Sequence, residues 1–194
     1  MIIVSDGVVR TPYHRAMATI AHHPVIARLQ AEVRAIRASG DLAALGRSLR
    51  RAALDGAWVT PRHREIDPEQ GFGSHLLFEE ENHDLALFVV SWAPGRGAPP
   101  HDHGTWGVVC GMTGFESNTT WTKRPGGGIE RGADYVIGPG DLVTVGPEDI
   151  HSVTNLTDRP ATSLHLYGRH LNHVARNRFD PEAGTVNPFI VRIR

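Results

Sequence analysis

The stretch Pro100-His101-Asp102-His103-Gly104-Thr105-Trp106-Gly107 decides the fold, because it sets two histidines two residues apart among turn-forming residues. Side chains at positions i and i+2 of a strand project from the same face, so this pair can bring two imidazoles together inside a barrel. A second block, Gly140-Asp141 followed by Pro147, supplies a further histidine at His151. The sequence therefore predicts a metal site with the ligands His101, His103 and His151.

The two blocks resemble the two signature motifs of the cupin superfamily, which implies a double-stranded β-helix, or jelly-roll barrel. In cupins the first block usually carries a glutamate ligand seven residues before its closing glycine, Gly114 here, and that position is Gly107. A set of three histidines without the carboxylate is similar to the thiol dioxygenases, the family of cysteine dioxygenase and 3-mercaptopropionate dioxygenase. The resemblance covers roughly residues 58 to 178.

A second local match concerns the segment Ser163-Leu164-His165-Leu166-Tyr167, which resembles the Ser-x-His-x-Tyr relay of the same family. On a strand these three polar side chains face the same way, as a hydrogen-bonded row requires. The resemblance implies that Tyr167 points its hydroxyl at the substrate, with His165 holding Tyr167 and Ser163 holding His165. The alternative is an inward strand whose polar groups satisfy one another without catalytic effect.

The spacing of the ligands does not name the ion, because three imidazoles suit zinc, iron, nickel, copper or cobalt almost equally. The resemblance implies Fe(2+) and a reaction that adds O2 to the sulfur of a small thiol to give a sulfinate. Two other classes stay open. A zinc or nickel cupin with another reaction would not need the Ser163-His165-Tyr167 row, and a non-catalytic metal or ligand sensor would be expected to carry a DNA-binding or partner module beside the barrel.

Three positions in the sequence narrow the range of substrates that the resemblance implies. Cysteine dioxygenases have a cysteine seven residues after the first ligand that is cross-linked to the relay tyrosine, and this position is Val108 here, so no cross-link is expected. Their carboxylate-binding arginine corresponds to Ser74 or His75, which lacks the planar fork that pairs with a carboxylate. The bacterial 3-mercaptopropionate enzymes instead carry an arginine after the relay tyrosine, which resembles Arg176, with Arg178 as the near alternative. These differences favour 3-mercaptopropionate over cysteine, with mercaptosuccinate as a rival.

Length and composition agree with the expectation of a single cytoplasmic enzyme domain that has a small-molecule partner. The chain has 194 residues, enough for one sizeable core. Its 20 Lys and Arg nearly balance 21 Asp and Glu, so no overall field favours nucleic acid or an anionic membrane. The single cysteine, Cys110, excludes an internal disulfide and is expected to be a small buried hydrophobe. The start, residues 1–6, lacks the features of a secretory signal. The oligomeric state is open.

The spacing of apolar residues along the chain changes near residue 57, and this change divides the expected helices from the expected strands. Residues 1–57 are expected to form a helical segment on the barrel, with one helix from Pro24 to Gly40 and another capped by Asp41 and closed by Gly56. Residues 58–194 are expected to form the barrel within the same structural domain. Expected strands cover residues 75–78, 85–92, 107–110, 134–137, 142–145, 151–154 and 161–167, with 188–194 as a further candidate.

The arginines outside the motifs are expected to lie on the surface. Those of the second helix, Arg47, Arg50 and Arg51, are interpreted as a solvated face rather than a binding patch. The same expectation applies to Arg62, Arg64 and Arg96.

Overall fold

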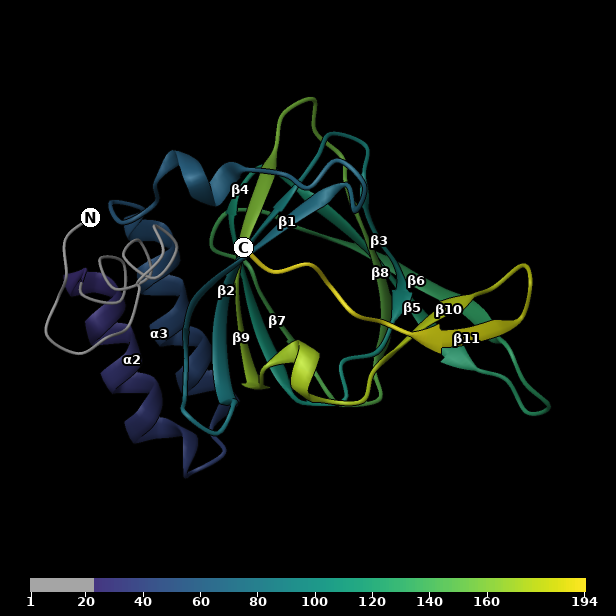
Figure 1. Ribbon diagram of the computed structural model, residues 1–194, viewed down its shortest axis with the longest axis horizontal. Helices are drawn as coiled ribbons and strands as arrows, with labels where there is room; N and C mark the ends of the chain where they lie inside the picture. The colour runs from purple at the N-terminus through teal and green to yellow at the C-terminus, as the bar shows by residue number, and fades with distance from the viewer. Residues whose placement is uncertain (1–22) are drawn as a thin grey trace, which may run out of the picture.

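The computed structural model describes residues 23–194, and residues 1–22, which include the start and the first part of the expected helical segment, lie outside this range. Two helices, α2 (Pro24–Arg37) and α3 (Leu42–Asp55), lie together on one side of a β barrel (Figure 1). Asp41 caps α3 by accepting a hydrogen bond from the Ala44 amide at 2.9 Å, and Gly56 ends it at a positive φ of 64°. Both predicted helices are confirmed.

The predicted mainly β class is also confirmed, since the strands form two sheets. One sheet has the order β1-β2-β9-β4-β7 and the other the order β11-β10-β3-β8-β5-β6. The chain passes from one sheet to the other between β2 and β3, β3 and β4, and β4 and β5, as in a double-stranded β-helix. The strands are β1 (Phe72–Glu79), β2 (Asp84–Trp92), β3 (Gly97–His101), β4 (Gly107–Thr113), β5 (Glu116–Lys123), β6 (Ile129–Ile137), β7 (Leu142–Val145), β8 (Ile150–Asn155), β9 (Ala161–Arg169), β10 (Asn177–Asp180) and β11 (Thr185–Pro188).

Two hydrophobic clusters lie on opposite faces of the first sheet. Along β2, Leu85 and Leu87 belong to the cluster beneath the helices, whereas Ala86 and Phe88 belong to the cluster inside the barrel. Strand side chains alternate between faces, so β2 is buried on both sides and its sequence is an almost continuous apolar run. The helices therefore cover the outer face of this sheet and leave its inner face to build the interior of the barrel.

The strands β5, β10 and β11 were not expected from the sequence, and one expected strand was wrong. The strand expected at the His101–His103 pair exists as β3 but ends at His101. The strands β5 and β10 carry mostly polar side chains (ESNTTWTK and NRFD), so hydrophobic periodicity gave no signal for them. In the segment 188–194, Pro188 ends β11 and the residues after it are not a strand, apart from one isolated bridge between Ile193 and Ser74. Instead the C-terminal residues run as an extended segment from the β10–β11 hairpin across the barrel to β1 (Figure 1).

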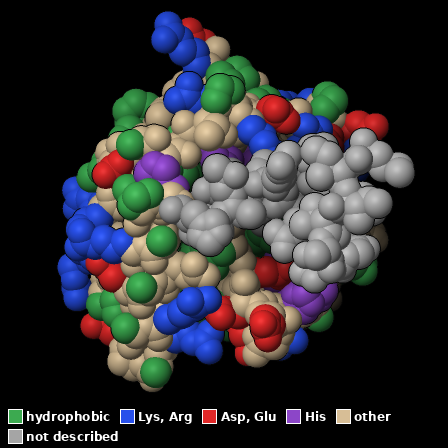
Figure 2. Space-filling view, turned by 60° about the vertical axis from the view of Figure 1, so that its left-hand side comes forward, with side chains coloured by type: hydrophobic (Ala, Val, Ile, Leu, Met, Phe, Trp, Pro, Cys, Tyr) green, Lys and Arg blue, Asp and Glu red, His purple; other side chains and the backbone are tan. Residues whose placement is uncertain are grey.

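The helical side of the molecule has a mixed charge pattern. Lys and Arg side chains are interspersed with Asp and Glu on the face shown in Figure 2. Arg51 pairs with Glu32 at 2.5 Å, and the exposed Arg47 lies 4.0 Å from Asp41. This arrangement agrees with the expected solvated face. None of the helices in residues 23–194 is long and apolar enough to cross a membrane.

Candidate metal centre

The three predicted ligands come together inside the barrel. His101 ends β3 and lies directly opposite His151 of β8 in the antiparallel register. His103 follows two residues after the end of β3, so the strand expected to carry both histidines of the pair carries only the first. All three are buried, and one ring nitrogen from each lies within 4.8 Å of the others. The donor set and its spacing fit a single metal ion held by three imidazoles.

Neighbouring acceptors fix the orientation of two of these rings. His101 Nδ1 lies 2.8 Å from the Pro99 carbonyl oxygen, and His151 Nδ1 lies 2.9 Å from Asn118 Oδ1. Both oxygens only accept, so Nδ1 carries the proton in each ring and the Nε2 lone pair is free for a metal. Burial lowers the pKa of His101 and His103 well below the ordinary value and that of His151 to about 4. The imidazoles are therefore neutral, as metal ligands must be.

Asn118 offers a first test of the site without removing a ligand. Replacing Asn118 by alanine is expected to lower metal affinity roughly 10- to 100-fold, since residues that orient a metal-bound histidine typically contribute this much. Metal titration of the metal-free protein measures the change. Asn187→Ala, a matched substitution of an exposed asparagine on β11, should leave the affinity unchanged. Equal affinities for Asn118→Ala and the wild type would show that His151 needs no support.

Gly107, the position of the usual cupin glutamate, has no space for a side chain. It pairs with Tyr167 across β4 and β9. A Cβ atom at this position would lie 2.8 Å from two carbons of the Tyr167 ring and 2.9 Å from a Val145 methyl carbon. The tyrosine ring thus occupies the space beside the cluster that a carboxylate ligand would otherwise need.

The Ser163-His165-Tyr167 segment forms a continuous row on the inner face of β9. Ser163 Oγ lies 2.7 Å from His165 Nε2, and His165 Nδ1 lies 2.9 Å from the Tyr167 hydroxyl oxygen. The Tyr167 ring stacks on His103 at a centroid distance of 5.7 Å. Burial lowers the pKa of His165 to about 3 and raises that of Tyr167 to about 12. Both side chains are consequently neutral over the physiological pH range.

Arg176 is the cation of the site. Its side chain is 5% exposed, and its Nε and Nη1 atoms have no hydrogen-bond partner among the described residues. The guanidinium carbon lies 4.5 Å from the ring centroid of Phe189, a cation–π contact. Burial lowers its pKa to about 10, which leaves it charged at neutral pH. A buried charge with unpaired donors fits an anionic ligand in the adjacent cavity.

The backbone beside the ligands holds Arg176 in place. Asp102, between the two histidines, accepts hydrogen bonds from the Asn177 backbone amide at 2.6 Å and from its side chain at 3.2 Å. Gly104 adopts a positive φ of 61°, and a Cβ atom there would overlap the Ala175 carbonyl. The segment that carries Arg176 can therefore lie directly against the ligand loop.

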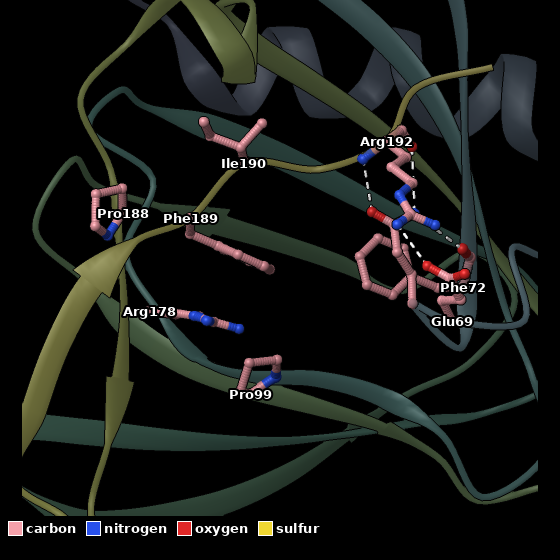
Figure 3. Close-up of a pocket in the computed structure, with 9 residues that line it drawn as sticks. Glu69, Phe72, Pro99, Arg178, Pro188, Phe189, Ile190 and Arg192 are labelled. Atoms are coloured by element: carbon pink, nitrogen blue, oxygen red, sulfur yellow. Dashed lines mark hydrogen bonds and ion pairs between the residues drawn. The ribbon is translucent and has the colours of Figure 1, made fainter.

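The cavity between these groups is small. It has a volume of about 30 Å³ and is lined by Arg176, His101, His151, Tyr167 and Phe189, among others. Phe189 also lines a separate outer pocket of about 480 Å³. In that pocket Arg178 lies between Pro99 and Phe189, and Arg192 pairs with Glu69 (Figure 3). Phe189 of the C-terminal segment thus lies between the inner cavity and the outer pocket, and Arg178 lines only the outer one.

The remaining positions from the sequence divide between the two sides of the sheet. Val108 and Cys110 both lie in the cluster beneath the helices, and burial raises the pKa of the Cys110 thiol to about 11. Gly107, rather than Val108, is therefore the residue of β4 that faces Tyr167, and it too lacks a thiol. Ser74 lines the inner cavity, whereas His75 contacts the Glu65 carbonyl oxygen at 2.9 Å.

Sequence reasoning missed three residues of the site, Asp102, Asn118 and Phe189. Asn118 lies on β5, where alternate burial of Glu116 and Asn118 is visible only once the strand is known. The threonines at 119, 120 and 122 were the available signal, because threonine favours strands. Phe189 belongs to the segment wrongly expected to be a strand.

No protein-family model matches the chain. Solved structures of similar fold include a double-stranded β-helix protein from Klebsiella pneumoniae, with 12% identity, 62% of this chain and 89% of that chain covered, and a TM-score of 0.49. KdgF from Halomonas sp. has 16% identity, coverage of 57% and 92%, and a TM-score of 0.45. An oxalate oxidase in complex with glycolate has 14% identity, coverage of 57% and 59%, and a TM-score of 0.44. At these identities the likeness concerns the fold alone.

Proposed function

We propose that this protein is a non-haem iron(II) thiol dioxygenase that oxidises a small carboxylate-bearing thiol, with 3-mercaptopropionate as the leading candidate, to the sulfinate. The reaction RS⁻ + O2 → RSO2⁻ balances without a further reductant, because both oxygen atoms are added to sulfur. The observation that carries the proposal is that one cavity is lined by members of three groups: the cluster of three neutral imidazoles, the Ser-His-Tyr row and an unpaired buried guanidinium.

Each group has a separate task in this proposal. His101, His103 and His151 would hold iron(II), which would supply a redox-active centre for the reaction between a thiolate and dioxygen. Arg176 would bind the substrate carboxylate and so orient the sulfur toward the three histidines. Tyr167 would hydrogen-bond to the bound reactants, held in place by His165 at 2.9 Å. Phe189 would limit the access of water to the cavity, where the charge of Arg176 then acts more strongly.

The ion and the reaction can be tested together. Protein purified without oxygen is expected to contain about one iron per chain and to consume one O2 per thiol, with a product heavier by two oxygen atoms. Metal analysis, oxygen uptake on a panel of small thiols and mass spectrometry measure these quantities. Zinc or nickel at full occupancy with no oxygen uptake for any thiol would favour a cupin of another reaction class.

The relay tyrosine is expected to act as an unmodified phenol. Neither Gly107 nor Val108 supplies a thiol, so intact-mass analysis should show no loss of two hydrogens. Tyr167→Phe is expected to keep the fold and the metal but to lower kcat roughly 10- to 100-fold, because it removes a hydrogen bond and no ligand. Thr185→Val, which removes an exposed hydroxyl group on β11, should retain the wild-type rate. Wild-type turnover in Tyr167→Phe would show that the Ser163-His165-Tyr167 row has only a structural role.

A further inference from the structure

A buried carboxyl group lies beyond the Ser163 end of the row. Glu116, the first residue of β5, is 3% exposed, and its Oε1 atom has no hydrogen-bond partner among the described residues. Burial raises the pKa of this carboxyl group, and the hydrogen-bonding side chains of Ser163 and Trp92, which lie beside it, oppose that effect. Trp92 Nε1 also donates to Ser163 Oγ at 3.3 Å. The row of polar groups therefore continues from Tyr167 through His165 and Ser163 to Glu116.

We propose that Glu116 is the fourth member of this row and that its protonation determines whether Tyr167 directs its hydroxyl proton toward the cavity or toward His165. Glu116 is a positioning residue, since it reaches Tyr167 only through Ser163 and His165. The inference builds on the role proposed for Tyr167 but concerns hydrogen bonds that exist without metal or substrate.

The direction of the row follows from the number of protons each group can donate. Neutral His165 has one ring N–H, and Ser163 has one O–H and two lone pairs. When Glu116 is ionised it accepts the Ser163 proton, so Ser163 Oγ accepts from His165 Nε2. His165 Nδ1 is then bare and accepts the Tyr167 proton, which leaves Tyr167 without a donor for the cavity.

Protonation of Glu116 reverses every bond in the row. The carboxylic acid donates to Ser163, whose hydroxyl then donates to His165 Nε2. The single ring proton of His165 moves to Nδ1 and is donated to the Tyr167 oxygen. The Tyr167 proton is free to point into the cavity that His101, His151 and Arg176 line.

The environment of Glu116 favours a change of state near neutral pH. Burial raises its pKa to about 7, against the opposing hydrogen bonds of Ser163 and Trp92. The neighbouring strand β6 places Tyr135 near it, and Tyr167 on β9 also senses its charge. Its cross-strand partner on β8 is Asn155, which does not titrate. With a raised pKa, Glu116 is mainly protonated below pH 7 and mainly ionised above it.

The test follows the ring proton of His165 in the metal-free protein by 15N NMR of labelled histidine, between pH 5.5 and 8.5. His165→Gln identifies the signal. In the wild type we expect the proton on Nδ1 at low pH and on Nε2 at high pH, with a midpoint near 7. In Glu116→Gln the tautomer should not change with pH, because an amide does not titrate. In Glu116→Met the ring proton of His165 should stay on Nδ1 at every pH, since Ser163 can then donate only to His165.

Glu130→Gln, the same change at an exposed carboxylate of β6, should keep the wild-type transition. A wild-type tautomer that is constant over this range, or an unchanged transition in Glu116→Gln, would overturn the proposal. If the protein also oxidises thiols, kcat of the wild type should fall about tenfold above the transition with little change in KM. The NMR result stands or falls independently of that activity, so failure of the proposed reaction is distinguishable from failure of this inference.

Discussion

Replacement of His151 by alanine is expected to strip the metal from the purified protein and to abolish oxygen uptake. Within residues 23–194 the three histidines are the one cluster of His, Cys, Asp or Glu side chains that could hold a metal ion, with Gly107 in the place of the usual carboxylate and the Tyr167 ring in the space beside it. A site with two remaining imidazoles has lost one of its three ligands, so the loss of affinity should exceed the roughly 10- to 100-fold cost of removing a supporting residue. Metal content after anaerobic purification and oxygen uptake measure the effect.

The same result is expected for His101→Ala and His103→Ala. His173→Ala is the matched control, because this exposed histidine stacks on His83 outside the cluster. Circular dichroism distinguishes loss of metal from loss of fold. Stoichiometric iron in folded His151→Ala would contradict the ligand assignment, whatever the substrate.

The fold was predictable where apolar residues recur at regular helical spacing or form a continuous run of strand length. In α3 the apolar residues recur at helical spacing, between a capping aspartate and a glycine with positive φ, so both ends were correct. In β2 and β9 both faces are buried, which gives apolar runs of strand length. Strand β5 could not be predicted, for the opposite reason. Its outer face is largely solvated, and its buried residues Glu116 and Asn118 are polar because they face the site.

The candidate site was predictable as a set of residues but not as a network. Motif spacing identified His101, His103 and His151, and the polar period of two identified the row on β9. Sequence spacing could not reveal that Asn118 orients His151 or that Asp102 holds the backbone of Asn177, because these pairs join strands far apart in the chain. The choice between Arg176 and Arg178 likewise depended on their positions, since only Arg176 lines the inner cavity.

The proposed substrate class depends on Arg176, the residue proposed to bind the carboxylate. An unpaired guanidinium that is almost fully buried costs the fold stability, because desolvation of the charge is only partly offset by the Phe189 ring. Replacing it by methionine or alanine should therefore leave the protein folded, with a thermal midpoint no lower than a few degrees below that of the wild type. An anionic ligand would supply the missing hydrogen bonds, which gives a functional reason for retaining this residue.

Arg176→Ala is accordingly expected to raise KM strongly for thiols that carry a carboxylate. A charge-assisted, two-point contact in a partly dry pocket contributes about 2 to 4 kcal/mol, which corresponds to roughly 30- to 1000-fold. Cysteamine has no carboxylate, so its oxidation should hardly change. Steady-state oxygen uptake with 3-mercaptopropionate, cysteine, mercaptosuccinate and cysteamine measures the pattern.

Arg178→Ala is the matched control for this experiment, because Arg178 lies in the outer pocket beyond Phe189. Arg176→Lys should recover only part of the loss, since an ammonium keeps the charge but cannot make the planar, two-point contact. If KM rises for cysteamine as much as for 3-mercaptopropionate, the loss reflects the shape of the cavity instead of carboxylate binding. If cysteine has the highest kcat/KM in the wild type, the proposed substrate is wrong, while the metal assignment is decided separately by the histidine variants.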